Sequence, residues 1–130
     1  MRYLACLIVG LVVGAITAST FVNATAQREA WPRGIMNVMQ HELGNARTAT
    51  RARQCATPTM QSAASHLQLL ATDIEPALLA PGTKDRVFSQ YASDLRAALA
   101  KWNANADCAQ QGAALTVVAN TCEACHRDYR

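Results

Sequence analysis

Apolar residues recur at three- and four-residue steps in four segments of the chain, the pattern of amphipathic helices that pack around a shared core. The segments run from about residue 32 to 54, from 58 to 76, from 83 to 102, and from 107 onward. Such helices, joined by short connections, favour an all-α, antiparallel up-down-up-down four-helix bundle. The positions expected to point inward are Met36, Met39, Leu43, Ala46 and Thr50; Met60, Ala64, Leu67, Leu70 or Ala71, and Ile74; Phe88, Tyr91, Leu95, Ala98 and Trp102; Leu115, Val118 or Ala119, Cys122, His126 and Tyr129.

Residues that start or stop helices separate these segments. Pro32 stands where a proline is tolerated, in the expected first turn of the first segment. Pro76 is expected to end or kink the second segment. Thr83 is the expected N-cap of the third segment. Asp107 is the expected N-cap of the fourth, with Gln110 three residues on as in a capping box.

The N-terminal segment differs in kind from the rest. Arg2 supplies a positive charge, residues 4–22 carry none, and Asn23–Ala26 ends in an Ala-x-Ala pattern. This arrangement predicts a secretory signal peptide over residues 1–26 and a single mature domain over residues 27–130. The alternative is an uncleaved anchor, because the apolar run approaches the length that spans a bilayer. Small and polar residues in its second half favour cleavage, after which no stable membrane anchor is expected.

The mature part is small and nearly neutral. Only one of the twelve Lys and Arg residues, Arg2, lies in the leader, and all nine acidic residues follow it. Without a concentrated basic face, no nucleic-acid partner is expected. About 100 residues bury only a modest core, and Ala, Thr and Met fill much of it here. A bulky apolar cofactor would add the buried surface that these side chains lack.

The strongest chemical signal is Cys122-Glu123-Ala124-Cys125-His126. C-x-x-C-H is the signature of c-type haem attachment, because two thiols at this spacing reach the two vinyl groups and the adjacent imidazole turns over the ring to the iron. We predict one covalent haem c on Cys122 and Cys125, with His126 as the proximal iron ligand. Three alternatives are a redox pair, which requires a βαβ context, a four-ligand zinc site, and a plain Cys122–Cys125 disulfide.

This ending resembles that of the class II c-type cytochromes, cytochrome c-prime and its low-spin relatives. In both, C-x-x-C-H is followed by two residues, an aromatic residue and a basic residue, here Tyr129 and Arg130. The resemblance covers the mature chain in helix order and is specific only in this last segment. It implies a periplasmic four-helix bundle with haem near one end, attached to the fourth helix and covered by the first. It also implies Tyr129 packing beside the ring, Arg130 near the proximal side or a propionate, and homodimers as in many relatives. The alternative for Arg130 is a solvated cation at the end of the last helix.

The other face of the iron decides the function. In the family, either an apolar residue of the first helix leaves this face open or a methionine closes it. Met36 and Met39 lie early in the first segment, which an antiparallel bundle places beside His126. We predict Met36 as the distal ligand, with Met39 as second choice; the alternative is that both fill gaps in the core. His41 and His66 are expected on the surface.

Met/His ligation predicts a small periplasmic electron carrier whose partners are redox proteins. The alternative is a five-coordinate protein that binds nitric oxide or carbon monoxide behind an apolar wall, for which Ile35 and Val38 are nearby. The sequence contains no Ser/His/Asp set, paired carboxylates or Gly-rich phosphate loop, so we do not predict an enzyme.

A second cysteine pair lies outside the haem motif. Cys55 falls between the first and second segments, and Cys108 between the third and fourth. In an up-down bundle these two connections meet at the same end, opposite the haem. Because an exported chain meets oxidising conditions, we predict a Cys55–Cys108 disulfide.

Overall fold

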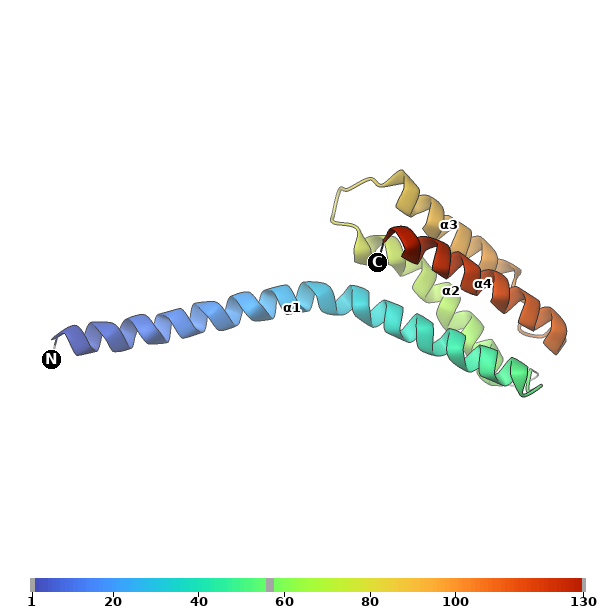
Figure 1. Ribbon diagram of the computed structural model, residues 1–130, viewed down its shortest axis with the longest axis horizontal. Helices are drawn as coiled ribbons and strands as arrows, with labels where there is room; N and C mark the ends of the chain where they lie inside the picture. The colour runs from blue at the N-terminus through green and yellow to red at the C-terminus, as the bar shows by residue number, and fades with distance from the viewer. Residues whose placement is uncertain (1, 56–57, 130) are drawn as a thin grey trace. The chain divides into compact units, whose positions relative to one another are not determined.

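The computed structural model describes residues 2–55 and 58–129, and within these residues it contains four α-helices and no strand. The helices are α1 (Arg2–Arg51), α2 (Pro58–Leu78), α3 (Arg86–Lys101) and α4 (Cys108–Asp128) (Figure 1). The predicted all-α class is confirmed for this part of the chain.

The chain divides into two compact units, Met1–Arg33 and Gly34–Arg130. Along residues 8–22 of the first unit, many large apolar side chains are exposed: Ile8, Val9, Leu11, Val12, Val13, Ile16, Phe21 and Val22. Over residues 2–55 and 58–129, no helix is both long enough and apolar enough to cross a membrane. The buried core begins only in the second unit, at Ile35.

The start predicted for the first helix is wrong. Pro32 lies inside α1 and not in its first turn, because the helix already runs from Arg2. A proline inside a helix removes one backbone hydrogen bond and crowds the preceding turn, and the residues on both sides of Pro32 are nevertheless helical. The boundary between the two units follows one residue later, between Arg33 and Gly34.

The core of the second unit is built from all four helices. Most of the predicted inward positions are buried, and alanine is the commonest residue among them. Ile35, which was not among those positions, is only 2 % exposed. The core residues are Ile35, Met39, Ala46, Met60, Ala63, Ala64, Leu67, Ala71, Ile74, Phe88, Ala92, Leu95, Ala98, Leu99, Trp102, Leu115 and Val118.

Two aspartates cap the last two helices. Asp107 caps α4 as predicted, since its Oδ1 accepts a hydrogen bond from the backbone N–H of Gln110 at 2.8 Å. α3 is capped by Asp85 and not by Thr83: the Asp85 Oδ1 accepts from the N–H groups of Val87 and Phe88, each at 3.0 Å. Thr83 instead belongs to the preceding turn, where its N–H donates to the carbonyl of Ala80.

Polar contacts join neighbouring helices of the second unit. Between α2 and α3, Arg96 Nη1 lies 2.9 Å from Glu75 Oε2, and Gln68 Nε2 donates to the carbonyl of Leu99 at 3.2 Å. α3 also packs against α4, and Figure 1 shows the two running alongside each other. α1 contacts α2 through Glu42 and His66, whose Oε1 and Nδ1 atoms are 3.0 Å apart.

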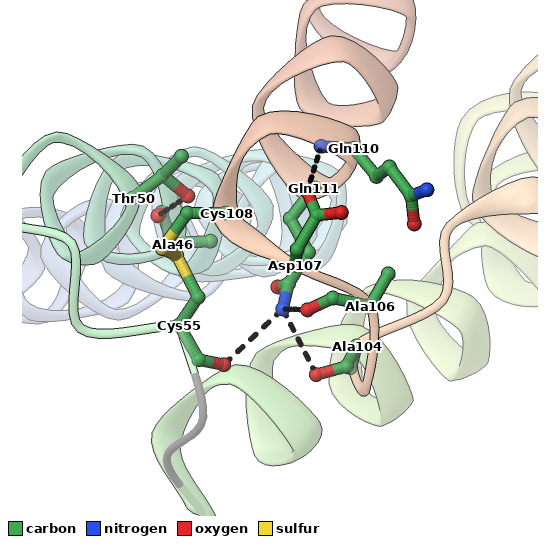
Figure 2. Close-up of a disulfide and its surroundings, with 9 residues drawn as sticks. All are labelled: Ala46, Thr50, Cys55, Ala104, Ala106, Asp107, Cys108, Gln110 and Gln111. Atoms are coloured by element: carbon green, nitrogen blue, oxygen red, sulfur yellow. Dashed lines mark hydrogen bonds between the residues drawn. A yellow bond between two sulfur atoms is a disulfide. The ribbon is translucent and has the colours of Figure 1, made fainter.

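The predicted Cys55–Cys108 disulfide is present and ties the residues after α1 to the first turn of α4, with Cα atoms 5.4 Å apart. Beside it, Gln111 is fully buried. Figure 2 shows its amide nitrogen pointing at three backbone carbonyls, those of Cys55 (3.2 Å), Ala104 (3.1 Å) and Ala106 (2.8 Å). One side chain therefore joins the two connections that the disulfide brings together, the residues after α1 and those between α3 and α4.

Candidate functional site

A cavity of about 530 Å³ lies in the second unit and is lined by all four helices. This volume is within the range of small-molecule and cofactor sites. Its walls are mostly apolar, with a few polar groups among them. The apolar part includes Leu43, Leu67, Ile74, Phe88 and Leu95.

The cavity brings together five of the site residues that the sequence singles out. Cys122, Cys125 and His126 line it from α4, and Met36 and Met39 line it from α1. Arg130, the remaining predicted cofactor-binding residue, lies outside the described residues.

The three residues of the C-x-x-C-H motif share one face of α4. Cys125 follows Cys122 by three residues and His126 follows it by four, the spacings that place side chains on the same side of a helix. Both cysteines are half-buried free thiols, while the His126 side chain is exposed at the cavity. Burial raises the pKa of the Cys122 thiol, and the neighbouring Cys125 adds to this rise. Burial also raises the pKa of Cys125, with a further contribution from the charge of Asp128. Both sulfurs are therefore held as neutral thiols at neutral pH.

The apolar part of the α1 wall consists of two thioethers and one branched side chain, and Gln40 and Arg47 line the cavity from the same helix. Met39 is 7 % exposed and belongs to the core, while Met36 is half-buried and packs against that core. Leu43 completes the wall one turn further along α1. Ile35 and Val38 do not line the cavity: Ile35 is buried in the core and Val38 is 46 % exposed. The two residues that the sequence offered for an apolar distal wall are therefore not part of the cavity lining, whereas Leu43 is.

His41 and His66 lie away from the cavity, as predicted. Both side chains are exposed; His66 contacts Glu42, and His41 Nε2 lies 3.0 Å from Asn45 Nδ2. Among the side chains that the structure describes, no group of three or more His, Cys, Asp or Glu could hold a metal ion. Since Cys55 and Cys108 form a disulfide, they are not thiolate ligands for zinc.

An aromatic cluster closes the cavity beside His126. Phe88 and Tyr91 of α3 and Tyr129, which caps α4, all line the cavity. The Tyr129 ring meets Phe88 edge-to-face with centroids 5.1 Å apart, and Tyr91 at 6.1 Å. Tyr129 packs beside the cavity with 37 % of its surface exposed, so it is less enclosed than a core residue.

Each tyrosine hydroxyl of this cluster donates to an aspartate. Tyr91 donates to Asp128 Oδ2 at 2.6 Å, and Tyr129 donates to Asp85 Oδ2 at 2.8 Å. Partial desolvation together with the bond to Asp85 raises the pKa of Tyr129 to about 12, and the bond to Asp128 raises that of Tyr91. The N–H of Phe88 and the Tyr129 hydroxyl lower the pKa of Asp85. Sequence reasoning missed both pairs; the only signal was that semi-buried tyrosine hydroxyls require acceptors.

The residues around the cavity fit a covalently attached haem. Two thiols on one helix face can hold one edge of a macrocycle, an imidazole follows directly, and thioethers stand on a different helix of the same cavity. Apolar walls suit the body of such a group. No protein-family model, curated protein or solved structure matches the chain.

Proposed function

We propose that the chain is an exported class II c-type cytochrome that carries single electrons in the periplasm. One haem c is attached through Cys122 and Cys125, with its iron bound by His126 and Met36. The observation that carries the proposal is that the C-x-x-C-H residues of α4 and the methionines of α1 line one apolar cavity. Its partners are redox proteins, and no catalytic role is proposed.

Attachment uses the two thiols on α4. Each thiol would hold the group through one thioether bond, with the S–H adding across a vinyl group and no atom lost. Because the addition would consume no oxidant, it would need both cysteines in the reduced state. The separate pairing of Cys55 with Cys108 is consistent with this, because it leaves the motif cysteines free.

Bound haem supplies an iron that gains and loses one electron. His126 would hold the iron from the α4 side, and the apolar side chains of Leu43, Leu67 and Phe88, which line the cavity, would keep water from it. Met36 is favoured over Met39 as the distal ligand because Met39 is part of the buried core, whereas Met36 is only half-buried. Methionine ligation raises the potential, and closed iron needs little rearrangement when its charge changes.

The helix contacts support the antiparallel topology that this function requires. Glu75 meets Arg96 and Gln68 meets Leu99, so residue numbers rise along α2 as they fall along α3. Tyr91 meets Asp128 in the last turn of α4, whereas Gln111 in the first turns of α4 reaches the carbonyl of Ala104, just after α3. For such an order we propose that the start of the first helix of the bundle lies beside the end of α4, with the haem near that end.

Export is proposed from the N-terminal segment, with residues 1–26 as a cleaved signal peptide and residues 27–130 as the mature protein. The run of exposed apolar side chains in the first unit supports this, because an apolar middle is typical of a signal peptide. The disulfide also fits an oxidising compartment.

A second function is supported by Leu43, which lines the cavity from the same helix as the two methionines. If Leu43 and not a thioether faced the iron, the sixth position would stay open. The protein would then bind nitric oxide or carbon monoxide as a five-coordinate cytochrome c-prime-like protein.

Absorption spectra of the full-length chain, produced with haem maturation machinery, test these proposals. We expect a low-spin spectrum with a methionine–iron charge-transfer band that carbon monoxide leaves unchanged. Met36→Ala should abolish the band, and the matched variant Met39→Ala should retain it. Loss of the band only in Met39→Ala would move the ligand to Met39. A high-spin spectrum that shifts with carbon monoxide would support the gas-binding function, and a chain without covalent haem would contradict both.

A further inference from the structure

The two tyrosine–aspartate bonds beside the cavity form a reciprocal clamp between α3 and the end of α4. Tyr91 of α3 donates to Asp128 of α4, while Tyr129 at the end of α4 donates to Asp85 at the start of α3. The two bonds are 2.6 Å and 2.8 Å long, and the Tyr91 and Tyr129 rings meet edge-to-face between them.

We infer that this clamp, made of Asp85, Tyr91, Asp128 and Tyr129, positions His126 by ordering the last turn of α4 against α3. Its members are positioning residues, since they act through the backbone that carries the imidazole. The part of the inference that concerns the iron rests on the proposed function. The ordering of the last turn of α4 does not, because it is a property of the chain itself.

The place of His126 in α4 makes such a device necessary. α4 ends at Asp128, two residues after His126. The last turn of a helix has carbonyls without intrahelical partners, and helix ends open at lower free-energy cost than helix centres. Here the turn is closed by the N–H of Tyr129, which donates to the carbonyl of Cys125 at 3.0 Å. The residue that makes this closing bond is thus also fixed through its side chain.

The strength of the clamp comes from the chemistry of its partners. Hydrogen bonds to ionised carboxylates are stronger than those between neutral groups. Edge-to-face ring pairs add to the stabilisation, and Tyr129 makes two of them, with Phe88 and Tyr91. The clamp is therefore anchored in α3 independently of any group in the cavity.

The two carboxylate oxygens of Asp85 have different partners, and Asp85 thereby connects the clamp to the start of α3. Its Oδ1 caps α3 by accepting from two backbone N–H groups, and its Oδ2 accepts from Tyr129. Capping and clamping can therefore be separated by substitution. Asp85→Ser retains a good N-cap side chain but is too short to reach Tyr129. Asp107→Ser makes the same change at the N-cap of α4, away from the clamp, and serves as the matched control.

The test compares amide hydrogen exchange in the full-length protein, its Asp85→Ser variant and the double variant Tyr91→Phe/Tyr129→Phe. The double variant keeps the stacked rings and removes only the hydroxyls. Losing charge-assisted bonds should speed exchange of the Tyr129 and Asp128 amides by about tenfold or more. Asp107→Ser should leave both amides unchanged. Circular dichroism verifies that each variant is folded.

The second measurement is the electron paramagnetic resonance spectrum of the ferric protein, which reports the geometry of the iron ligands. In both clamp variants we expect a second or broadened low-spin signal, which a purely structural role elsewhere would not produce.

Unchanged exchange at Tyr129 and Asp128 would overturn the clamp. Faster exchange with an unchanged iron signal would overturn the positioning of His126 while leaving the proposed function intact. If the wild-type chain holds no haem, the proposed function fails, and the amide exchange alone decides whether the clamp orders the turn.

Discussion

Two regions of the Gly34–Arg130 unit each contain a pair of cysteines, and the two pairs differ in almost every physical respect. Cys55 and Cys108 come from different connections of the chain, and they are bonded to each other. Cys122 and Cys125 are three residues apart on one helix, face a cavity and are not bonded.

The surroundings of the two pairs differ as well. In the disulfide region, the fully buried Gln111 amide binds three carbonyls and fills the space between backbone segments (Figure 2). In the cavity region, apolar side chains from four helices surround a space of about 530 Å³. The disulfide region is filled by the chain's own side chains, while free thiols, thioethers and apolar side chains line a cavity in the other region. The comparison shows one chain in which two cysteines close the fold and two others remain as free thiols at a cavity.

The largest expected effect separates the two pairs directly. Replacing both motif cysteines, Cys122→Ser/Cys125→Ser, should abolish covalent haem attachment, because no thiol then remains in the motif to form the C–S bonds. A haem stain of the chain on a denaturing gel measures this. Cys55→Ser/Cys108→Ser should retain the stain. Equal loss of stain in both double variants would break the distinction between the pairs.

The next effect belongs to the disulfide region. Cys55 and Cys108 are separated by 53 residues in sequence, and a cross-link over such a loop stabilises a fold by about 4 kcal/mol in the loop-entropy treatment. Cys55→Ser/Cys108→Ser should lower the free energy of unfolding by about that amount, as measured by urea denaturation. Cys6→Ser, at an exposed cysteine of the first unit, should leave it unchanged. A loss below about 1 kcal/mol would show that the buried contacts around Gln111 hold this region without the bond.

The features that depend on regular spacing could be predicted from the sequence. Apolar residues at three- and four-residue steps identified α2, α3 and α4 and most of their buried faces, because helical periodicity is a local property. The disulfide could be predicted from the connectivity, because it is enough to know which two connections lie at the same end of the bundle. Gln111 was detectable in principle: it precedes Leu115 and Val118 by four and seven residues, in register with their buried face.

The features that depend on three-dimensional placement could not be predicted. Thr83 and Asp85 are both good N-cap residues, but Asp85 is the N-cap of α3 and Thr83 belongs to the turn that contains Gly82. Ile35 and Met36 are neighbours in sequence, but the first faces the core and the second lines the cavity. Likewise, the sequence contains the two tyrosines and several aspartates but does not show which of them pair. The pairs are fixed by the packing of α3 on α4.

A third prediction concerns the buried amide beside the disulfide. Gln111→Leu should lower the free energy of unfolding by about 1.5 kcal/mol, because three carbonyls in two connections lose their donor. The loss is moderated because the Gln111 Oε1 is itself buried without a partner among the described residues. Gln110→Leu is the matched control on the exposed neighbour and should change stability by less than about 0.5 kcal/mol. Chemical denaturation of both variants measures the difference. An equal effect would mean that Gln111 does not hold the segments together.

The smallest effect comes from an ion pair that belongs to neither region, so it sets the baseline for the comparison. A hydrogen bond from Ser89 and the bond and charge of Arg96 lower the pKa of Glu75 from its ordinary value of 4.5. A depressed pKa in the folded state means that the contribution is fully present above about pH 4.5 and is lost as the pH falls through the folded value. Because the Glu75 and Arg96 side chains are 30 % and 35 % exposed, solvent screens the pair and Glu75→Gln should cost only about 0.5 kcal/mol at pH 7. Denaturation at pH 7 should show this difference in the free energy of unfolding between the wild type and Glu75→Gln, and denaturation at pH 3 should show a smaller one. A double-mutant cycle with Arg96→Gln isolates the pair, and a coupling as large as the effect of Gln111→Leu would show that the buried amide has no special role.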